Sequence, residues 1–174
     1  DCRQKQHMFD RSRTLYEYAA AAPSIYRFKY KGRQEYAEFF GEEMGKYLGD
    51  FIRSVSPDVL VPVPLHKKKL SKRGYNQAAC LARALGKNMQ LPVDEKLVKR
   101  VRNTAMKHLN PTERQNNLKK AFNIGRNDVK LYGRIILVDD IYTTGTTLDE
   151  IAALLKSHGV SEVYCVTLAC GAGL

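Results

Sequence analysis

Ile135-Ile-Leu-Val-Asp-Asp-Ile-Tyr-Thr-Thr-Gly-Thr-Thr147 is the stretch that decides the fold of this 174-residue chain. Its first four residues are apolar, which is typical of a strand buried inside a parallel sheet. Two consecutive carboxylates follow, and a turn rich in hydroxyl groups then leads into a helix. Open parallel sheets bind their ligands beyond the carboxyl ends of the strands. The stretch therefore predicts a buried strand with a binding site at its carboxyl end.

The turn within this stretch predicts a site for an anion. A helix that begins after a turn presents free backbone N–H groups and the positive end of its dipole. Gly145 lets the backbone approach a ligand closely, because it carries no side chain. One phosphate group is the natural occupant. Hydroxyl donors come from four threonines: Thr143, Thr144, Thr146 and Thr147.

The two acids before the turn, Asp139 and Asp140, cannot help to bind phosphate and need hydrogen-bond donors or a cation. Vicinal ribose hydroxyls supply donors, and hydrated Mg²⁺ supplies a cation. A ribose 5-phosphate therefore satisfies both halves of the stretch. The alternative is a strand followed by an acidic helix N-cap that binds no ligand. A P-loop is excluded because no lysine follows Gly145 where Walker A requires one. A phospho-acceptor receiver domain would carry its acid pair near the first strand, whereas this pair lies late in the chain.

The rest of the chain predicts strands and helices in alternation. Apolar residues at helical spacing indicate a helix from residue 34 to 55, and Asn76 can cap a second helix. The order of elements favours an open, mainly parallel, doubly wound α/β sheet. Predicted strands cover residues 24–30, 58–64, 134–138 and 162–168, and a third helix covers 148–156. Residues 66–74 are predicted as a basic loop, and 96–120 as a mobile excursion with a short helix around 112–119.

Charge and composition restrict the partners and the compartment. The chain has 29 Lys and Arg against 18 Asp and Glu, a net charge of +11. This balance fits nucleic acid, phosphorylated metabolites or an anionic membrane face, and equally a solvated basic surface. No apolar run reaches the roughly 18 residues of a membrane helix, and the first residues do not form a signal peptide. We therefore expect a cytoplasmic protein, in which Cys80 and Cys165 are core residues and no disulfide is required.

The 135–147 stretch resembles the phosphoribosyl-diphosphate signature of type I phosphoribosyltransferases. Further segments narrow the resemblance to the ComF/GntX family, in the branch of the ComFC competence proteins. The resemblance extends over residues 24 to 170 and implies the fold of the type I phosphoribosyltransferases. These segments are 26–32 (YRFKYKG), 61–65 (VPVPL), 73–77 (RGYNQ) and 114–122 (RQNNLKKAF).

The resemblance also implies roles for individual residues. Asp139 and Asp140 would be the catalytic acids, and Mg²⁺ would be held through the bound diphosphate rather than directly by protein ligands. A departure is Lys107, because relatives often carry Gln there, which leaves the detail of loop closure undetermined. The loop that closes over the site would offer Arg100, Arg102, Thr104 and Arg114. The pyrophosphate loop would contribute His66, Lys67, Lys69, Lys72, Arg73, Gly74 and Asn76.

Members of this family commonly carry a four-cysteine zinc module before the domain. Cys2 resembles the last ligand of such a module, and one cysteine cannot hold zinc tetrahedrally. We therefore divide the chain into an N-terminal segment, residues 1–23, and a phosphoribosyltransferase-like domain, residues 24–174. Zinc is expected only if a cysteine module precedes this sequence in the full-length chain. The alternative is an unrelated surface cysteine.

Two functions follow from the resemblance. In the first, the protein binds phosphoribosyl diphosphate and acts in natural competence, handling single-stranded DNA with the competence helicase at the DNA-uptake machinery on the inner membrane face. Three basic stretches, 27–33, 67–73 and 96–107, fit single-strand binding because aromatic residues lie among them. The alternative is that these aromatic residues belong to the core: Tyr26, Phe28, Tyr30 and Tyr75.

In the second function, the protein is an active phosphoribosyltransferase in nucleotide or base salvage. It would transfer phosphoribosyl from the diphosphate to a nitrogen nucleophile, with the two acids stabilising positive charge on the ribose ring. The sequence shows no segment that can be identified as recognising an acceptor base. The acceptor and the oligomeric state are therefore not predicted.

Overall fold

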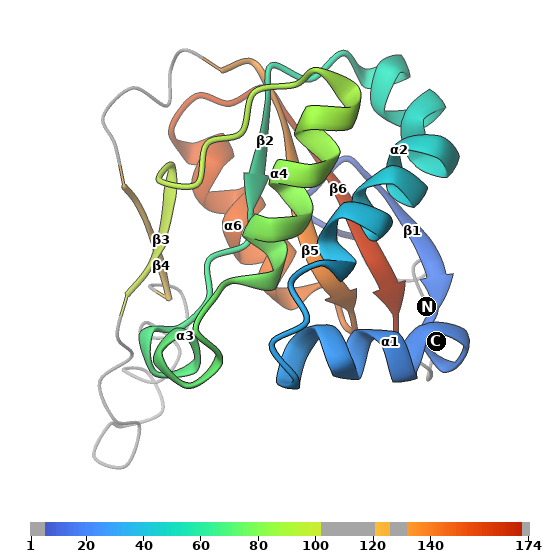
Figure 1. Ribbon diagram of the computed structural model, residues 1–174. Helices are drawn as coiled ribbons and strands as arrows, with labels where there is room; N and C mark the ends of the chain where they lie inside the picture. The colour runs from blue at the N-terminus through green and yellow to red at the C-terminus, as the bar shows by residue number, and fades with distance from the viewer. Residues whose placement is uncertain (1–5, 102–120, 126–131, 172–174) are drawn as a thin grey trace.

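The computed structural model describes residues 6–101, 121–125 and 132–171 of the chain (Figure 1). Its centre is a four-stranded sheet in which every neighbouring pair of strands is parallel. The predicted mainly parallel sheet is confirmed. The strands, in their order across the sheet, are β1 (Arg11–Glu17), β6 (Glu162–Cys170), β5 (Arg134–Tyr142) and β2 (Val59–Pro62).

Helices cover both faces of this sheet, which makes the fold doubly wound as predicted. Alternate residues of β5 point to opposite faces. Ile136 packs in one apolar core with α2 (Tyr36–Val55) and α4 (Gln77–Met89), whereas Leu137 packs in a second core with α6 (Thr146–Ser157). Because both faces are covered, β5 reads as a continuous apolar run rather than an alternating one. No described helix combines the length and the apolar character that crossing a lipid bilayer requires.

A two-stranded antiparallel sheet lies beside the second core. It pairs β3 (Val98–Arg100) with β4 (Phe122–Ile124), and Val98 and Phe122 are buried in that core. The two strands bracket most of the segment that the sequence predicts as a mobile excursion. Residues 102–120, including the helix predicted around 112–119, lie outside the described residues.

The strand predicted for residues 24–30 is wrong. These residues form the second half of helix α1 (Tyr18–Tyr30). The same residues that alternate along a strand also repeat at helical spacing, because Ile25 and Phe28 lie three positions apart on one face. Both side chains are fully buried, and together with Ala21 they attach α1 to the first core.

Two further elements differ from the sequence prediction. The basic loop predicted at residues 66–74 contains a short helix, α3 (Lys67–Arg73), none of whose residues is buried. The His66 side chain caps its start by accepting a hydrogen bond from the Lys68 backbone N–H at 3.2 Å. Strand β1 is not predicted by the sequence pattern; it lies within the first 23 residues and forms an edge of the main sheet.

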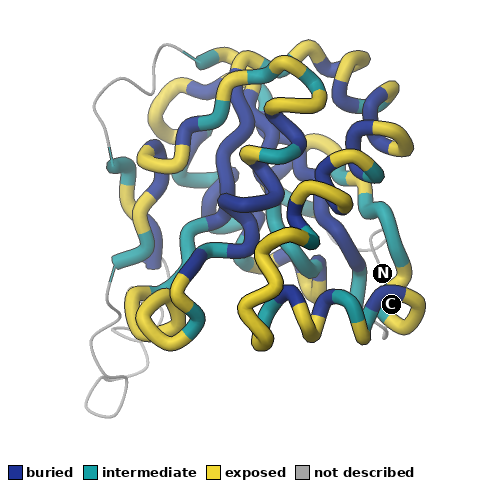
Figure 2. The backbone as a smooth tube through the Cα atoms, in the orientation of Figure 1, coloured by how far each residue is buried: buried dark blue, intermediate teal, exposed yellow. Residues whose placement is uncertain are grey.

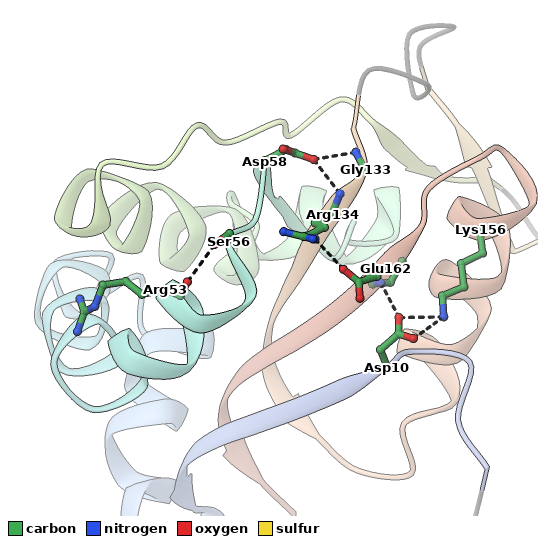
Figure 3. Close-up of polar contacts among 9 residues, drawn as sticks. Asp10, Arg53, Ser56, Asp58, Gly133, Arg134, Lys156 and Glu162 are labelled. Carbon is green, nitrogen blue, oxygen red and sulfur yellow. Dashed lines mark hydrogen bonds and ion pairs between the residues drawn. The ribbon is translucent and has the colours of Figure 1, made fainter.

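The two ends of the main sheet differ in character. At the amino ends of the strands, ion pairs join neighbouring elements: Arg134 with Glu162 at 2.7 Å, and Lys156 with Asp10 at 2.8 Å (Figure 3). Asp58 there accepts two backbone hydrogen bonds from the start of β5, at 2.7 and 2.8 Å. At the carboxyl ends, α1 lies across β1, β5 and β6, and α3 lies beyond β2 (Figure 1).

Candidate functional site

The phosphate loop, which is the turn predicted from Thr143 to Thr147, lies at the carboxyl end of β5 and leads directly into α6. Gly145 is the N-cap of α6 and has a left-handed backbone, with φ of +73°. A Cβ atom here would lie 2.8 Å from the Tyr142 hydroxyl oxygen, so the turn also needs glycine for space. The Thr144 and Thr146 hydroxyls are 2.9 Å apart at the rim. The turn therefore exposes hydroxyl groups and the free N–H groups of a helix start.

A small hollow of about 50 Å³ joins this loop to one of the two acids. Its lining includes Asp139 and every residue from 141 to 148, so the structure brings together the five predicted loop residues and Asp139. Asp140 does not line it. Adjacent residues of a strand point to opposite faces, so the two carboxylates diverge from β5. Of the two acids, only Asp139 lines this hollow.

Each acid has its own environment. Asp139 accepts a hydrogen bond from the Asp140 backbone N–H at 2.8 Å, while Asp140 pairs with Lys29 Nζ of α1 at 3.0 Å. Burial, and then the neighbouring charge on Asp140, raises the pKa of Asp139 to about 8. Burial therefore favours the protonated form of Asp139, whereas a cation or a donor beside it favours the charged form. A carboxyl group with such a shift, at the mouth of a hollow, is typical of a functional site.

A network that the sequence does not predict supports the phosphate loop from behind. His7 bonds through Nδ1 to Asp149 at 2.9 Å and through Nε2 to the Tyr142 hydroxyl at 3.2 Å. The ring of His7 also stacks on Phe9, with centroids 4.5 Å apart. These contacts hold the two residues on either side of the turn. No local motif marks His7, because its partners lie more than 130 positions away in the chain.

The residues predicted to hold pyrophosphate are divided by α3 into two groups. His66, Lys67 and Asn76 line a hollow of about 720 Å³ that extends toward β3. Lys69, Lys72 and Arg73 line a second hollow of about 350 Å³ that faces α1. Gly74 lines neither hollow; with φ of +81° it ends α3.

The RGYNQ motif at residues 73–77 connects α3 and α4 to α1. The Asn76 side-chain amide donates to the Val63 carbonyl at 3.0 Å and accepts from the Ala78 backbone N–H at 3.1 Å. Asn76 therefore caps α4 as predicted. The Tyr75 hydroxyl donates to the Phe28 carbonyl of α1, and both rings belong to the first core. These contacts fix the walls of the two hollows.

Arg100, predicted for the loop that closes over the site, ends β3 and lines the larger hollow. Its guanidinium carbon lies 5.2 Å from the centre of the Phe122 ring. Its positive charge also acts on Asp139 and opposes the rise of that pKa. The other residues predicted for this loop lie outside the described residues: Arg102, Thr104, Lys107 and Arg114.

In the described part of the chain, no group of three or more His, Cys, Asp or Glu side chains is placed to hold a metal ion. Mg²⁺ commonly binds through one or two carboxylates, waters and the phosphates of a ligand, so Asp139 and Asp140 would contact such an ion only together with a bound phosphate ligand. Cys2 lies outside the described residues, so the zinc-module hypothesis stays a prediction. Cys80 and Cys165 are buried, as predicted for core residues.

Known proteins resemble this chain along most of its length. The family described as "Phosphoribosyl transferase domain" matches residues 56–173. Competence protein F of Haemophilus influenzae is 40% identical over 116 residues, which cover 65% of this chain and 50% of that protein. DNA utilization protein YhgH of Escherichia coli K12 is 33% identical over 173 residues, which cover 95% of this chain and 75% of that protein.

Two further proteins are similar to the chain. Competence protein ComFC of Bacillus subtilis 168 is 32% identical over 85% of this chain and 59% of its own length. Among solved structures, a purine phosphoribosyltransferase from Pyrococcus horikoshii Ot3 aligns over 91% of this chain and 78% of its own, with 19% identity and a TM-score of 0.47. The chain thus spans only about half to three quarters of these curated relatives.

Proposed function

Because the chain belongs to the phosphoribosyltransferase domain family, we propose that it binds phosphoribosyl diphosphate together with Mg²⁺. The 5-phosphate occupies the loop from Thr143 to Thr147, and the ribose hydroxyls donate to Asp139 and Asp140. The diphosphate extends toward His66, Lys67 and Asn76 in the larger hollow beside α3. We further propose that the protein acts in natural competence and contacts single-stranded DNA. The names of its relatives, which refer to competence and to DNA utilization, support this second part.

The single observation that carries the sugar-phosphate proposal is the hollow that Asp139 shares with the phosphate loop. Free N–H groups and hydroxyls at one end favour a phosphate, and a carboxyl group at the other end favours hydroxyl donors. A ribose 5-phosphate carries a phosphate and hydroxyl groups, and therefore matches both ends of this hollow. The raised pKa of Asp139 also supports the proposal, because a hydrogen-bond donor or a cation beside this carboxylate would stabilise its charged form.

Mg²⁺ supplies positive charge that offsets the diphosphate and the two acids. The diphosphate carries several negative charges into a site where Asp139 and Asp140 are also negative when ionised. Lys29 neutralises one of these acids, but the structure gives Asp139 no cationic partner within ion-pair distance among the described residues. A cation delivered with the diphosphate therefore complements the chain's own residues.

The proposed contact with single-stranded DNA is supported by part of the aromatic set. Phe28 and Tyr75 are buried, so for these two the core alternative holds. Tyr26 and Tyr30 are exposed beside basic residues of α1 and α3 and remain available for stacking. The competence helicase as a partner, and a position near the DNA-uptake machinery, stay predictions.

Calorimetry with phosphoribosyl diphosphate and Mg²⁺ tests the sugar-phosphate proposal. We expect the double variant Asp139→Asn/Asp140→Asn to lose binding by roughly 100-fold or more, because Asn has an NH₂ group in place of one acceptor oxygen and lacks the charge, and each lost hydrogen bond costs about 1 to 3 kcal/mol. Asp50→Asn, an exposed acid on α2, is the matched control and keeps wild-type affinity. Equal affinity in the wild type and the double variant would overturn the proposal. Thermal unfolding of both variants confirms that they fold.

The alternative function is catalysis of phosphoribosyl transfer in nucleotide or base salvage. A nitrogen atom of the acceptor would attack C1 of the ribose, the C1–O bond to pyrophosphate would break, and pyrophosphate would leave with the bonding electron pair. The nitrogen would then lose its proton. The hollow of about 720 Å³ next to α3 favours this function, because it has the size of an ordinary ligand pocket.

Pyrophosphate release tests this alternative. The purified protein is incubated with phosphoribosyl diphosphate, Mg²⁺ and a panel of nucleobases, amines and nucleic acids. Release that depends on one acceptor and disappears in Asp139→Asn supports transfer. Release with no acceptor dependence indicates hydrolysis alone and contradicts it.

A further inference from the structure

Two exposed tyrosines form a pair on the outer face of α1. Tyr26 and Tyr30 lie one helical turn apart, and their ring centroids are 5.2 Å from each other. Their exposed fractions are 53% and 56%, and neither belongs to the two apolar cores. Most of the surface of both rings is therefore available to a ligand. The pair is therefore a candidate stacking surface.

This tyrosine pair adjoins the hollow of about 350 Å³ between α1 and α3. Tyr30 itself is part of the lining. The Arg73 guanidinium lies 5.0 Å from the centre of the Tyr30 ring and donates to its hydroxyl at 3.3 Å. The rings and the hollow are thus one continuous surface. The complete lining is Lys29, Tyr30, Gly32, Lys69, Lys72 and Arg73.

The charges around this hollow are not balanced. Among the described residues, only Lys29 of its four cations has a carboxylate partner, Asp140. Lys69, Lys72 and Arg73 converge from α3 with no ion pair in the described part of the chain. Cations held close together repel one another, so a bound anion lowers the energy of this arrangement. α3 has no buried residue, so these side chains are not part of a core either (Figure 2).

We propose that this hollow and the tyrosine pair form a docking site for a single strand of DNA. A backbone phosphate of the strand occupies the hollow, and its bases stack on Tyr26 and Tyr30. A single strand carries charged phosphates beside flat bases, and the site places a group of cations beside two flat rings. This inference rests on the proposed role in DNA handling and deepens it by naming the surface. A pyrophosphate group alone would use the hollow but leave the tyrosines without a role.

The docking site touches the sugar-phosphate site through one residue. Lys29 lines the hollow and also pairs with Asp140 at 3.0 Å. A carboxylate can accept from several donors, so ribose hydroxyls that donate to Asp140 weaken its pairing with Lys29, and the ammonium group can also contact the strand's phosphate. The strand and the sugar phosphate therefore bind side by side on the carboxyl end of the sheet.

Fluorescence anisotropy with a labelled oligo-dT tests the docking site. We expect Tyr26→Ala/Tyr30→Ala to weaken binding by roughly 10-fold or more, whereas Tyr26→Phe/Tyr30→Phe keeps it, because stacking needs the ring and not the hydroxyl. Lys69→Ala/Lys72→Ala should make binding less dependent on salt, by about 0.7 in logarithmic slope for each phosphate that the variant no longer neutralises.

The matched control is Lys46→Ala/Tyr47→Ala on α2. Tyr47 is 59% exposed and Lys46 lies 4.9 Å from its ring, so this pair has the same chemistry without the basic hollow. Equal weakening by the control and the α1 variant overturns the docking site. So does loss of phosphoribosyl diphosphate binding, with unchanged oligo-dT binding, in Lys69→Ala/Lys72→Ala, because the hollow is then a pyrophosphate subsite only.

Calorimetry on the same proteins separates this inference from the proposed function. Tyr26→Ala/Tyr30→Ala is expected to bind phosphoribosyl diphosphate as the wild type does. If the wild type binds the sugar phosphate but no oligo-dT, the docking site is wrong and the sugar-phosphate site stands. If it binds oligo-dT through the tyrosines but no sugar phosphate, the sugar-phosphate proposal is wrong and the docking site stands.

Discussion

The two ends of the main sheet use similar residues for different purposes. At the amino end, Asp58, Asp10 and Glu162 are all satisfied by backbone N–H groups or by basic side chains of neighbouring elements (Figure 3). At the carboxyl end, Asp139 has a raised pKa and the basic residues of α3 have no ion pairs among the described residues. The charged groups of the first end join neighbouring elements of the fold. The second end has cations without carboxylate partners among the described residues and a carboxyl group whose ionisation is disfavoured, and both features are typical of a ligand-binding site.

The largest expected effect on stability is at the amino end. Asp58→Ala removes the acceptor of two backbone hydrogen bonds and should lower the free energy of unfolding by about 2 kcal/mol. Urea denaturation measures this change. Asp50→Ala is the control, because Asp50 is fully exposed and should change stability by less than about 0.5 kcal/mol. Similar small losses in both variants would remove the distinction between the two ends.

The opposite result is expected at the carboxyl end. The folded protein keeps the Asp139 proton up to about pH 8, whereas the unfolded chain loses it near pH 3.8. The free energy of unfolding therefore falls as pH rises between these two values. Asn cannot ionise, so Asp139→Asn should raise stability above pH 8 by about 1 to 2 kcal/mol, less than the whole shift because the carboxyl faces an open hollow.

Denaturation of Asp139→Asn at several pH values measures this effect. The gain should be small near pH 4 and should grow toward pH 8. A variant that is less stable than the wild type at pH 8 would show that Asp139 stabilises the fold, as Asp58 does. The contrast between the ends would then be wrong.

A smaller effect on ligand affinity is expected for His7, which supports the phosphate loop. His7→Ala removes the bonds to Asp149 and to Tyr142 that hold both sides of the turn. Affinity for phosphoribosyl diphosphate should fall by roughly 10-fold, because a less ordered loop must be fixed on binding. His158→Ala is the control, since His158 is exposed and bonds only within its own helix end. Unchanged affinity in His7→Ala would mean that the loop needs no such support.

Features that depend on neighbouring residues could be predicted from the sequence, whereas features that depend on residues far apart in the chain could not. Strands β2, β5 and β6 are predictable because apolar runs in a parallel sheet are local signals. The phosphate loop is predictable for the same reason, since Gly145 and its threonines adjoin the strand. Strand β1 escapes prediction because it is an edge strand with alternating exposed polar residues, including Arg11 and Arg13.

The remaining differences depend on tertiary contacts. Residues 24–30 fit a strand and a helix equally well, and the burial of Ile25 and Phe28 against α2 decides between them. The partners of His7 and the pairing of Lys29 with Asp140 join residues more than 100 positions apart, which no local pattern encodes. The sequence therefore predicts the ligand-facing loop but not the residues that support or connect it.

The smallest expected effect concerns the link between the two proposed ligands. Lys29→Met removes the cation that Asp140 and the α1–α3 hollow share. In the wild type, phosphoribosyl diphosphate with Mg²⁺ should tighten oligo-dT binding by roughly 5-fold, a modest coupling. The variant should show no such change. Coupling of the same size in Lys29→Met would assign the link to another residue.

The binding of phosphoribosyl diphosphate as a function of pH tests the central claim most directly. Calorimetry with Mg²⁺ in excess should show affinity that increases from neutral pH to about 8 and then levels off, because the ligand needs the ionised form of Asp139. Asp139→Asn should bind weakly at every pH. Affinity that is independent of pH across this range, or tight binding by Asp139→Asn, would contradict the assignment of the carboxyl end of β5 as the sugar-phosphate site.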